Sequence, residues 1–169
     1  MKTKHQVLTL ALLCTAIIYS CKKEGKTVPV QFYLTDKPGM YDSVNVHIKG
    51  IEVNIFHDTT AWISIDAKDT IINLLDLQNG ITQLIAQDIV PEGILQEVRF
   101  ILGDGNTVVV NGISYPLETP SAMTSGLKIK VNKRLNETFN AFILDFDAAQ
   151  SVSVENGIYR LDPVIRLTP

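Results

Sequence analysis

The sequence predicts an all-β protein, a two-sheet β-sandwich of the immunoglobulin- or transthyretin-like kind with one short helix. From residue 28 onward, apolar side chains recur mainly at every second position, which is the period of a strand with one buried face. Turn signals such as Asp104-Gly105 and Asn111-Gly112 separate these runs. About nine or ten short strands joined by such turns are typical of two packed sheets.

The beginning of the chain predicts an export signal. Two lysines precede an apolar run at residues 7–18, which is shorter than the ~20 residues of a membrane-spanning helix. The run ends at Ile18-Tyr19-Ser20-Cys21, which resembles the lipobox of bacterial lipoproteins. The alternative is that Cys21 is an ordinary thiol after a conventional signal cleavage. We expect a signal peptide at residues 1–20, an acylated N-terminus and tether at residues 21–27, and a single β-sandwich domain at residues 28–169.

Composition narrows the class of protein and of partner. Of the 169 residues, 46% are hydrophobic and 20% are charged, as in an ordinary globular domain. The formal net charge is −3 and becomes more negative when Lys2 and Lys4 leave with the signal. This balance argues against nucleic acid as a partner. Cys21 has no intramolecular disulfide partner once Cys14 is removed, which agrees with acylation.

The first two strands are expected at residues 28–34 and 44–55. In the second, apolar residues occupy even positions up to Ile48 and odd positions from Ile51. A one-residue slip turns every side chain to the other face, so we predict a β-bulge at Gly50 that keeps both halves on one core. We expect Gly50 to supply a positive φ angle there.

The middle of the chain is expected to hold edge strands, the helix and a meander. Residues 62–65 and 70–72 predict a short hairpin or edge pair. Between residues 74 and 87, the spacing of Ile81, Leu84 and Ile85 predicts the only helical turns, with Asn79 as the N-cap. Three strands then form a meander through the two turns named above, at residues 98–102, 107–110 and 113–115.

The C-terminal part is expected to hold the remaining strands. Leu127, Ile129 and Val131 alternate with lysines, as on an edge strand. Residues 139–147 are apolar on both faces and predict a central strand. Further strands are expected at residues 152–154 and 161–167.

Several segments together resemble a known family. They are Leu34-Thr35-Asp36-Lys37-Pro38, Tyr41-Asp42-Ser43-Val44, residues 120–128, residues 144–148 with 151–152, and Leu161-Asp162-Pro163-Val164-Ile165-Arg166. The chain is similar there to an uncharacterised lipoprotein family of Gram-negative bacteria, catalogued as domain of unknown function 4382. The resemblance implies an envelope-anchored, sandwich-like domain and brings no reaction with it.

The main candidate cluster is an acidic pair on the expected central strand. Asp145 and Asp147 share one strand face and could begin a calcium site, since calcium prefers several oxygen ligands. The interpretation we favour is a structural ion-pair cluster, with no metal, in which Arg99 or Arg166 pairs with at least one of them. An unpaired buried charge is costly, and both arginines lie in apolar strands.

Other features carry weaker hypotheses. Lys128, Lys130, Lys133 and Arg134 form a basic edge that could meet anionic headgroups or acidic glycans, although a solvated edge is the commoner explanation. Trp62 could form a sugar-stacking platform but is more often core in a sandwich. His47 is expected at the surface.

The function predicted from the sequence is a non-catalytic lipoprotein of the cell envelope, with the outer membrane as the expected location. Its sandwich would present loops to another envelope protein or a surface polysaccharide, with no cofactor. The rival hypothesis is a glycan-binding module for nutrient capture or adhesion, which requires exposed aromatic residues near Trp62 or the 120–126 loop. An enzyme is the third possibility, and no nucleophile and base can be proposed from their spacing.

Overall fold

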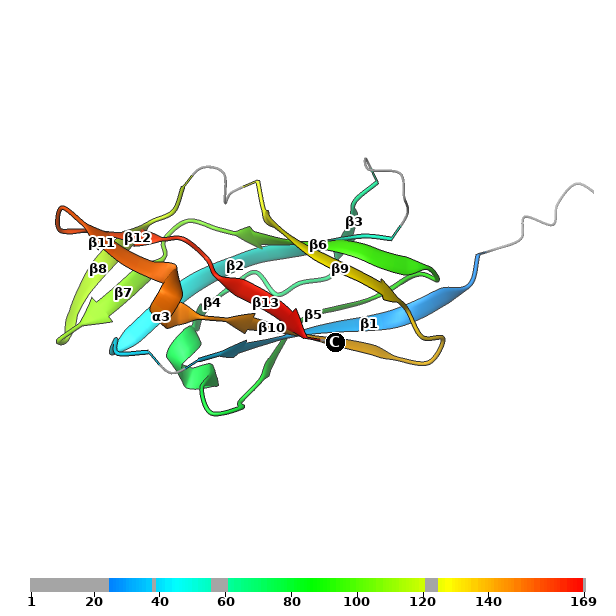
Figure 1. Ribbon diagram of the computed structural model, residues 1–169, viewed down its shortest axis with the longest axis horizontal. Helices are drawn as coiled ribbons and strands as arrows, with labels where there is room; N and C mark the ends of the chain where they lie inside the picture. Colours follow the sequence, from blue (N-terminus) through cyan, green and yellow to red (C-terminus); the bar gives the residue numbers. More distant parts are fainter. Residues whose placement is uncertain (1–24, 38, 56–60, 121–124, 169) are drawn as a thin grey trace, which may run out of the picture.

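Two β-sheets pack face to face in the computed structural model, which describes residues 25–37, 39–55, 61–120 and 125–168 (Figure 1). The smaller sheet has the strand order β13-β10-β1-β5, and the larger has the order β11-β12-β8-β7-β2-β6-β9 with β3 and β4 also paired to β2. The predicted two-sheet β-sandwich is therefore confirmed.

The strands are β1 (Thr27–Asp36), β2 (Ser43–Asn54), β3 (Ile63–Ile65), β4 (Thr70–Asn73), β5 (Gln83–Pro91), β6 (Ile94–Leu102), β7 (Thr107–Val110), β8 (Ile113–Glu118), β9 (Leu127–Arg134), β10 (Asn140–Phe146), β11 (Val152–Glu155), β12 (Ile158–Leu161) and β13 (Ile165–Thr168). The helical elements are a 3-10 turn, η2 (Leu74–Leu77), and one turn of α-helix, α3 (Ala148–Ser151). Within the described ranges, no helix is long and apolar enough to cross a membrane.

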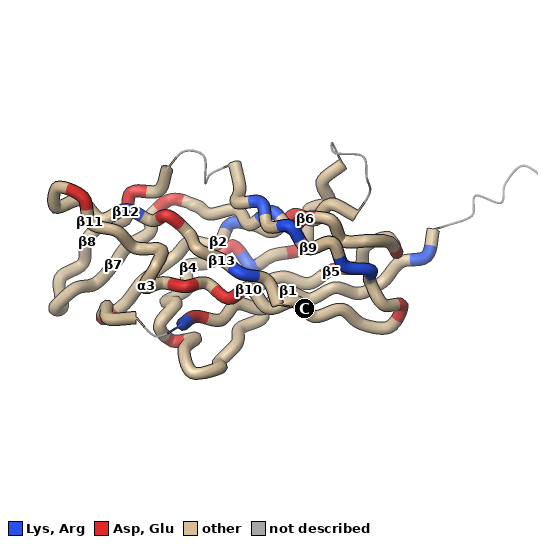
Figure 2. The backbone as a smooth tube through the Cα atoms, viewed as in Figure 1, with Lys and Arg blue, Asp and Glu red and all other residues tan. Residues whose placement is uncertain are grey.

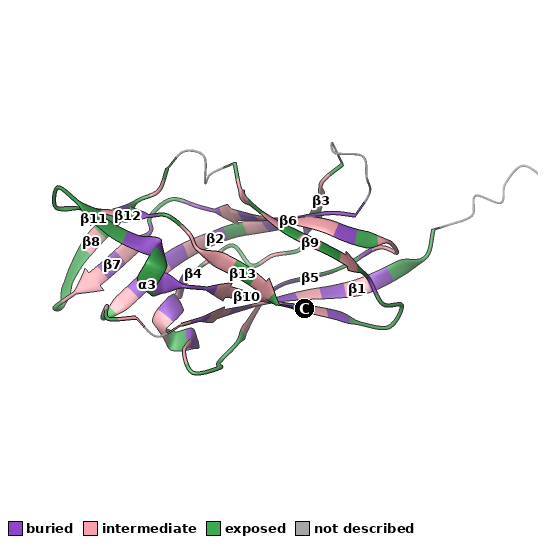
Figure 3. Ribbon diagram, viewed as in Figure 1, coloured by how far each residue is buried: buried purple, intermediate pink, exposed green. Residues whose placement is uncertain are grey.

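The core forms because strand alternation turns one apolar face of each sheet inward (Figure 3). β10 lies between β1 and β13, which confirms the expected central strand. Phe32 of β1 stacks on Phe142 of β10 with ring centroids 5.3 Å apart. Phe100 of β6 meets Phe146 edge-on at 6.4 Å, which joins the two sheets through their aromatic side chains.

The predicted bulge in β2 is confirmed. The register with β6 shifts between Ile48 and Gly50, so Lys49 is the extra residue, and the apolar side chains on both sides of the shift are buried. The expected backbone reason is wrong, because Gly50 is not among the glycines with positive φ. A Cβ atom there would lie 3.8 Å from Ile101 Cδ1, an ordinary contact.

The predicted helix is misplaced, because residues 83–91 form strand β5. A second bulge, opposite the Phe32–Tyr33 step of β1, turns both Ile85 and Ala86 toward the core. Two adjacent inward residues imitate helical spacing in the sequence. The 3-10 turn η2 lies before this strand, and the Asn73 side chain accepts the N–H of Leu75 as its cap.

The predicted meander is only partly correct. β7 and β8 form the expected hairpin, with positive φ at Asn111 and Gly112. β6 and β7 do not pair with each other, because both pair with β2, end to end along one side. β3 and β4 likewise pair with β2 along its other side, as edge strands and not as a hairpin with each other.

Candidate functional site

A furrow runs along the edge of the sandwich where β5 of the small sheet approaches the segment after β3 of the large sheet. The backbone N–H of Lys68 donates to the Ile85 carbonyl, and that of Gln87 donates to the Asp66 carbonyl, each at 3.0 Å. These bonds bridge the two sheets at Ala67 and Ala86. Three adjoining hollows of about 290, 100 and 400 Å³ flank the bridge and share Asp66, and together we call them the edge furrow.

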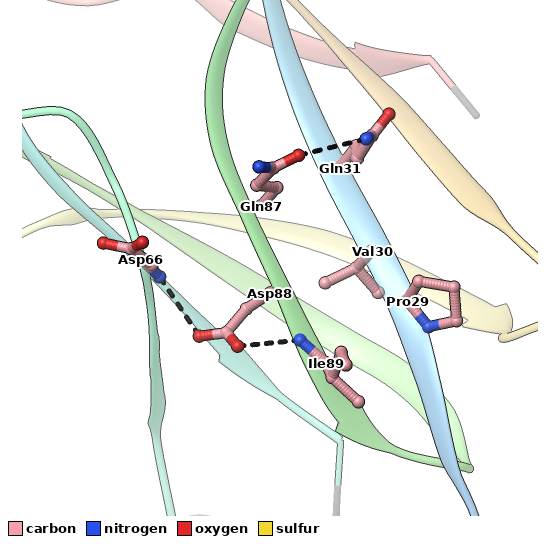
Figure 4. Close-up of a pocket in the computed structure, with 7 residues that line it drawn as sticks. All are labelled: Pro29, Val30, Gln31, Asp66, Gln87, Asp88 and Ile89. Carbon is pink, nitrogen blue, oxygen red and sulfur yellow. Dashed lines mark hydrogen bonds between the residues drawn. The ribbon is translucent and has the colours of Figure 1, made fainter.

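One wall of the edge furrow is a row of amides (Figure 4). Gln31 of β1 and Gln87 of β5 stand opposite each other in register, and Gln31 Nε2 donates to Gln87 Oε1 at 3.2 Å. The Tyr33 hydroxyl donates to Gln31 Oε1 at 2.8 Å. The Gln87 amide nitrogen keeps its hydrogens available to a ligand, since no bond to another described residue uses them.

Two aspartates complete the polar lining with different roles. Asp88 is fixed by the backbone, because its carboxylate accepts the N–H of Asp66 at 3.2 Å and that of Ile89 at 2.7 Å (Figure 4). The Asp66 carboxylate accepts no hydrogen bond from the described residues. Pro29 and Ile89 form the apolar end of the same hollow, and Ile89 is 67% exposed. The edge furrow therefore combines free acceptors and donors with an apolar patch.

The acidic pair lies elsewhere, where the parallel strands β1 and β10 both end. Asp145 is partly buried, as expected, with 22% of its side chain exposed, and Asp147 is buried, with 6% of its side chain exposed. Their partner is Lys37, which follows β1 and whose Nζ lies 3.5 Å and 3.6 Å from the two carboxylates. Asp147 also caps α3 by accepting the N–H of Gln150 at 3.1 Å.

The predicted pairing of Asp145 or Asp147 with Arg99 or Arg166 is thus wrong. Arg166 stands opposite Asp145 across β10 and β13, yet forms no ion pair among the described residues. Arg99 points out of the large sheet and pairs with Glu52 at 2.7 Å. Outward side chains of the two sheets face opposite directions, so those of β6 and β10 cannot meet. In the part of the chain that the structure describes, no group of three or more His, Cys, Asp and Glu side chains could hold a metal ion.

Burial shifts the pKa of a carboxyl group beside this cluster. Asp36, the last residue of β1, is 4% exposed and accepts the N–H of Ala148 at 2.8 Å. Burial raises the pKa of this carboxyl group, and the nearby Asp147 charge adds to the rise. The cluster at this end joins the strand ends to α3.

Trp62 lies over Arg99 on the outer face of the large sheet and is only partly exposed. The Arg99 guanidinium carbon is 3.9 Å from the ring centroid, and Lys128 Nζ is 5.6 Å from it. Trp62 is therefore not a core residue. Its ring is not open for sugar stacking either, because the Arg99 and Lys128 cations lie over it. Gly126 lies against the same arginine, since a Cβ there would come within 2.3 Å of Arg99 Cγ.

The basic edge predicted on β9 is present, and blue segments mark it in Figure 2. Lys128, Lys130 and Arg134 are exposed, whereas Lys133 turns toward the core and its Nζ lies 5.7 Å from the Phe142 ring. Glu97 stands opposite Lys130 and Glu52 pairs with Arg99, so acidic side chains offset this charge. We assign no ligand to this edge.

His47 is partly exposed, and both of its ring nitrogens are engaged. Nδ1 lies 2.9 Å from the Asp104 carbonyl and Nε2 lies 2.5 Å from Asp69 Oδ1. The hydrogen bond to Asp69 raises the pKa of His47, and the bond to the Asp104 carbonyl raises it further. No ring nitrogen is left to activate a nucleophile.

Two sequence predictions lie outside the described residues. They are the signal peptide with Cys21, and residues 121–124 of the loop proposed for glycan contact. The edge furrow itself was missed by the sequence reasoning, because four separate segments assemble it. The only local signal was the polar phase of β1, which places Gln31 and Tyr33 on one face.

Comparison with known proteins gives a family and a distant structural likeness. None of the curated proteins matches the chain. A solved structure from Bacteroides fragilis, described as a "putative cell adhesion protein", has 13% sequence identity and a TM-score of 0.39. The match covers 85% of this chain and 45% of that one, so the chain spans less than half its length. The model of the domain of unknown function DUF4382 matches residues 27–163, and the chain therefore belongs to that family, as the resemblance in its sequence indicated.

Proposed function

We propose that this protein is a non-catalytic cell-envelope protein, anchored through acylated Cys21, whose edge furrow binds an uncharged saccharide. The observation that carries the proposal is the Gln31–Gln87 amide pair beside the free carboxylate of Asp66. Planar amide and carboxylate groups can donate to and accept from adjacent hydroxyls of a sugar ring.

Charge restricts the class of saccharide. Asp66 and Asp88 line the hollow that holds Gln31 and Gln87, and no cation is among the described residues of that hollow, whereas Lys49 and Lys68 each line one of the other two. A polyanionic glycan would meet two like charges there and would be disfavoured. A neutral glycan is therefore the ligand that fits.

Size favours a saccharide over a protein partner. The hollows of about 290 and 400 Å³ lie in the range of small-ligand sites. A stable protein interface needs roughly 800 Å² of surface on each partner.

Calorimetry with the mature Cys21→Ser chain and neutral polysaccharide from the producing cells tests this proposal. We expect Gln87→Ala and Asp66→Asn each to weaken binding about tenfold, the effect of losing one good hydrogen-bonded contact. Gln150→Ala and Asp162→Asn are matched controls, since these exposed residues lie in α3 and directly after β12 and line none of the three hollows.

Two results would overturn the saccharide assignment. One is equal binding by the furrow variants and the controls. The other is no retained saccharide together with a protein cross-linked to edge furrow positions on intact cells, which would favour the envelope-protein partner.

A further inference from the structure

We propose that the end of the sandwich where β1 begins lies against a lipid bilayer and touches it through an apolar row formed by the half-buried Pro29 and the exposed Phe139 and Ile89. The proposal rests on the acylation of Cys21 that is part of the proposed function. It adds an orientation and a lipid-contacting surface.

The apolar row follows from register. Pro29 of β1 pairs with Ile89 of β5. Val30 pairs with Asn140, the first residue of β10, and the Asn140 amide donates to the Pro29 carbonyl at 3.0 Å. Phe139 precedes Asn140, so continuing the parallel register by one residue puts it next to Pro29 on the other side of β1. The neighbouring residues Val30, Val90 and Asn140 are buried, which turns the row to the outer face of the small sheet. Phe139 is 49% exposed and Ile89 is 67% exposed.

The apolar row belongs to one end of the molecule, where three chain segments meet (Figure 1, right). The N–H of Glu92 donates to the Lys26 carbonyl at 2.8 Å, and Lys26 Nζ lies 3.6 Å from Glu137. The N–H of Leu135 donates to the Gly93 carbonyl at 2.9 Å. These contacts join the start of β1 to the β5–β6 and β9–β10 turns.

The length of the tether indicates that the apolar row contacts a lipid bilayer. Cys21 precedes Thr27 by six residues, and six residues span at most about 20 Å when fully extended. An acyl chain on Cys21 therefore holds the β1 end near the bilayer surface. The hairpins β7–β8 and β11–β12 also expose apolar residues, Ile113 and Val154 among them, but lie at the opposite end (Figure 1, left).

Lipid contact at the apolar row leaves the amides of the edge furrow accessible. Gln31 and Gln87 form the next outward row along β1, two residues further from the tether. Two residues of a strand span about 6.6 Å, so the amides stand above a bilayer that touches Pro29. A saccharide bound there would be held close to the membrane surface.

Site-specific fluorescence quenching on the acylated protein tests this orientation. Once Cys14 is removed and Cys21 is acylated, an introduced cysteine is the single free thiol. An environment-sensitive probe is attached at Phe139→Cys or Ile89→Cys, with Ile113→Cys and Val154→Cys as controls, each 57% exposed in the parent residue. The proteins are reconstituted in phosphatidylcholine vesicles that carry nitroxide-labelled lipid, and circular dichroism checks each fold.

We expect at least threefold stronger quenching at positions 139 and 89 than at the two controls. Equal quenching at all four positions in a chain that floats with the vesicles would overturn the orientation and leave the anchor standing. A chain that does not float would overturn the anchor and the orientation together. If a photo-crosslinker at position 139 captures a protein instead of lipid on intact cells, the apolar row contacts a protein partner and the bilayer contact is refuted.

Discussion

Asp147→Asn should lower the free energy of unfolding by no more than about 1 kcal/mol, although Asp147 is only 5% exposed. The variant removes the charge that faces Lys37 at 3.6 Å, a separation beyond a normal hydrogen bond. Lys37 is 40% exposed and is shared with Asp145, so water screens the pair. Exposed ion pairs of this kind contribute about 0.2–1 kcal/mol.

Two further effects keep the loss of stability in Asp147→Asn small. Asn is as good a helix cap as Asp, so its Oδ1 can still accept the N–H of Gln150. The variant also removes the negative charge of Asp147, which repels the Asp36 carboxylate and helps to raise the pKa of Asp36. Asp147→Ala lacks the cap acceptor and should cost more, about 1–2 kcal/mol, which makes it the matched comparison.

The assay is urea unfolding of the Cys21→Ser chain at pH 7, followed by the fluorescence of Trp62, the single tryptophan. Each variant is measured with calcium and with chelator. A loss of 3 kcal/mol or more in Asp147→Asn would be typical of a broken buried ion pair and would refute the reasoning. A calcium-dependent stabilisation that the variant abolishes would refute it too, in favour of a metal site.

Three other predictions follow from the anchor, the bulge and His47. Cys21→Ser should move the protein from the detergent phase to the aqueous phase in phase separation, and unchanged partitioning at an unchanged mature mass would contradict acylation. Gly50→Ala should change stability by less than about 0.5 kcal/mol in urea unfolding, because φ is not positive there and a Cβ meets only Ile101 Cδ1 at 3.8 Å. The pKa of His47 is raised by Asp69, so its stabilisation should be complete below the unfolded pKa of about 6.5 and should be lost as pH rises through the folded pKa. His47→Asn should remove this pH dependence in thermal unfolding, and Asp69→Asn should reduce it.

Local patterns predicted the strands well, and their errors have specific physical causes. The alternation predicted for β1 was correct because this strand has one continuous buried face. The helix predicted on the residues of β5 was wrong because of the bulge in this strand. The bulge turns both Ile85 and Ala86 inward and breaks the period of two. The predicted pairing of β6 with β7 through Asp104-Gly105 was wrong because of Asn106. Its side-chain nitrogen donates to the Gly103 carbonyl and the Thr119 hydroxyl, and its side-chain oxygen accepts the N–H of His47. This directs the chain along β2 instead of back along β6.

The charged cluster shows what strand parity can and cannot predict. Parity correctly placed Asp145 and Arg99 on the outer faces of their strands. It does not say which sheet a strand joins, and in a sandwich the two outer faces point in opposite directions. The pairing of Lys37 with the aspartates depends on the parallel neighbours β1 and β10, which are more than a hundred residues apart in sequence. The edge furrow was unpredictable for the same reason, since its parts meet only after the sheets pack.

Three of the segments that carry the family resemblance, residues 34–38, residues 144–148 with 151–152, and residues 161–166, meet around α3, away from the edge furrow. Asp36 accepts the N–H of Ala148, and the Ser151 hydroxyl donates to the Asp147 carbonyl at 2.6 Å while accepting the N–H of Val164 at 2.9 Å. These buried bonds tie β1, β10 and the chain before β13 into one hub, which gives these residues a role in folding. Gln31, Gln87 and Asp66 lie outside every segment quoted for the resemblance. A chain that keeps the hub and changes these three positions should therefore keep the fold and bind a different ligand, and exchanging the three residues between two such chains should exchange their saccharide preference.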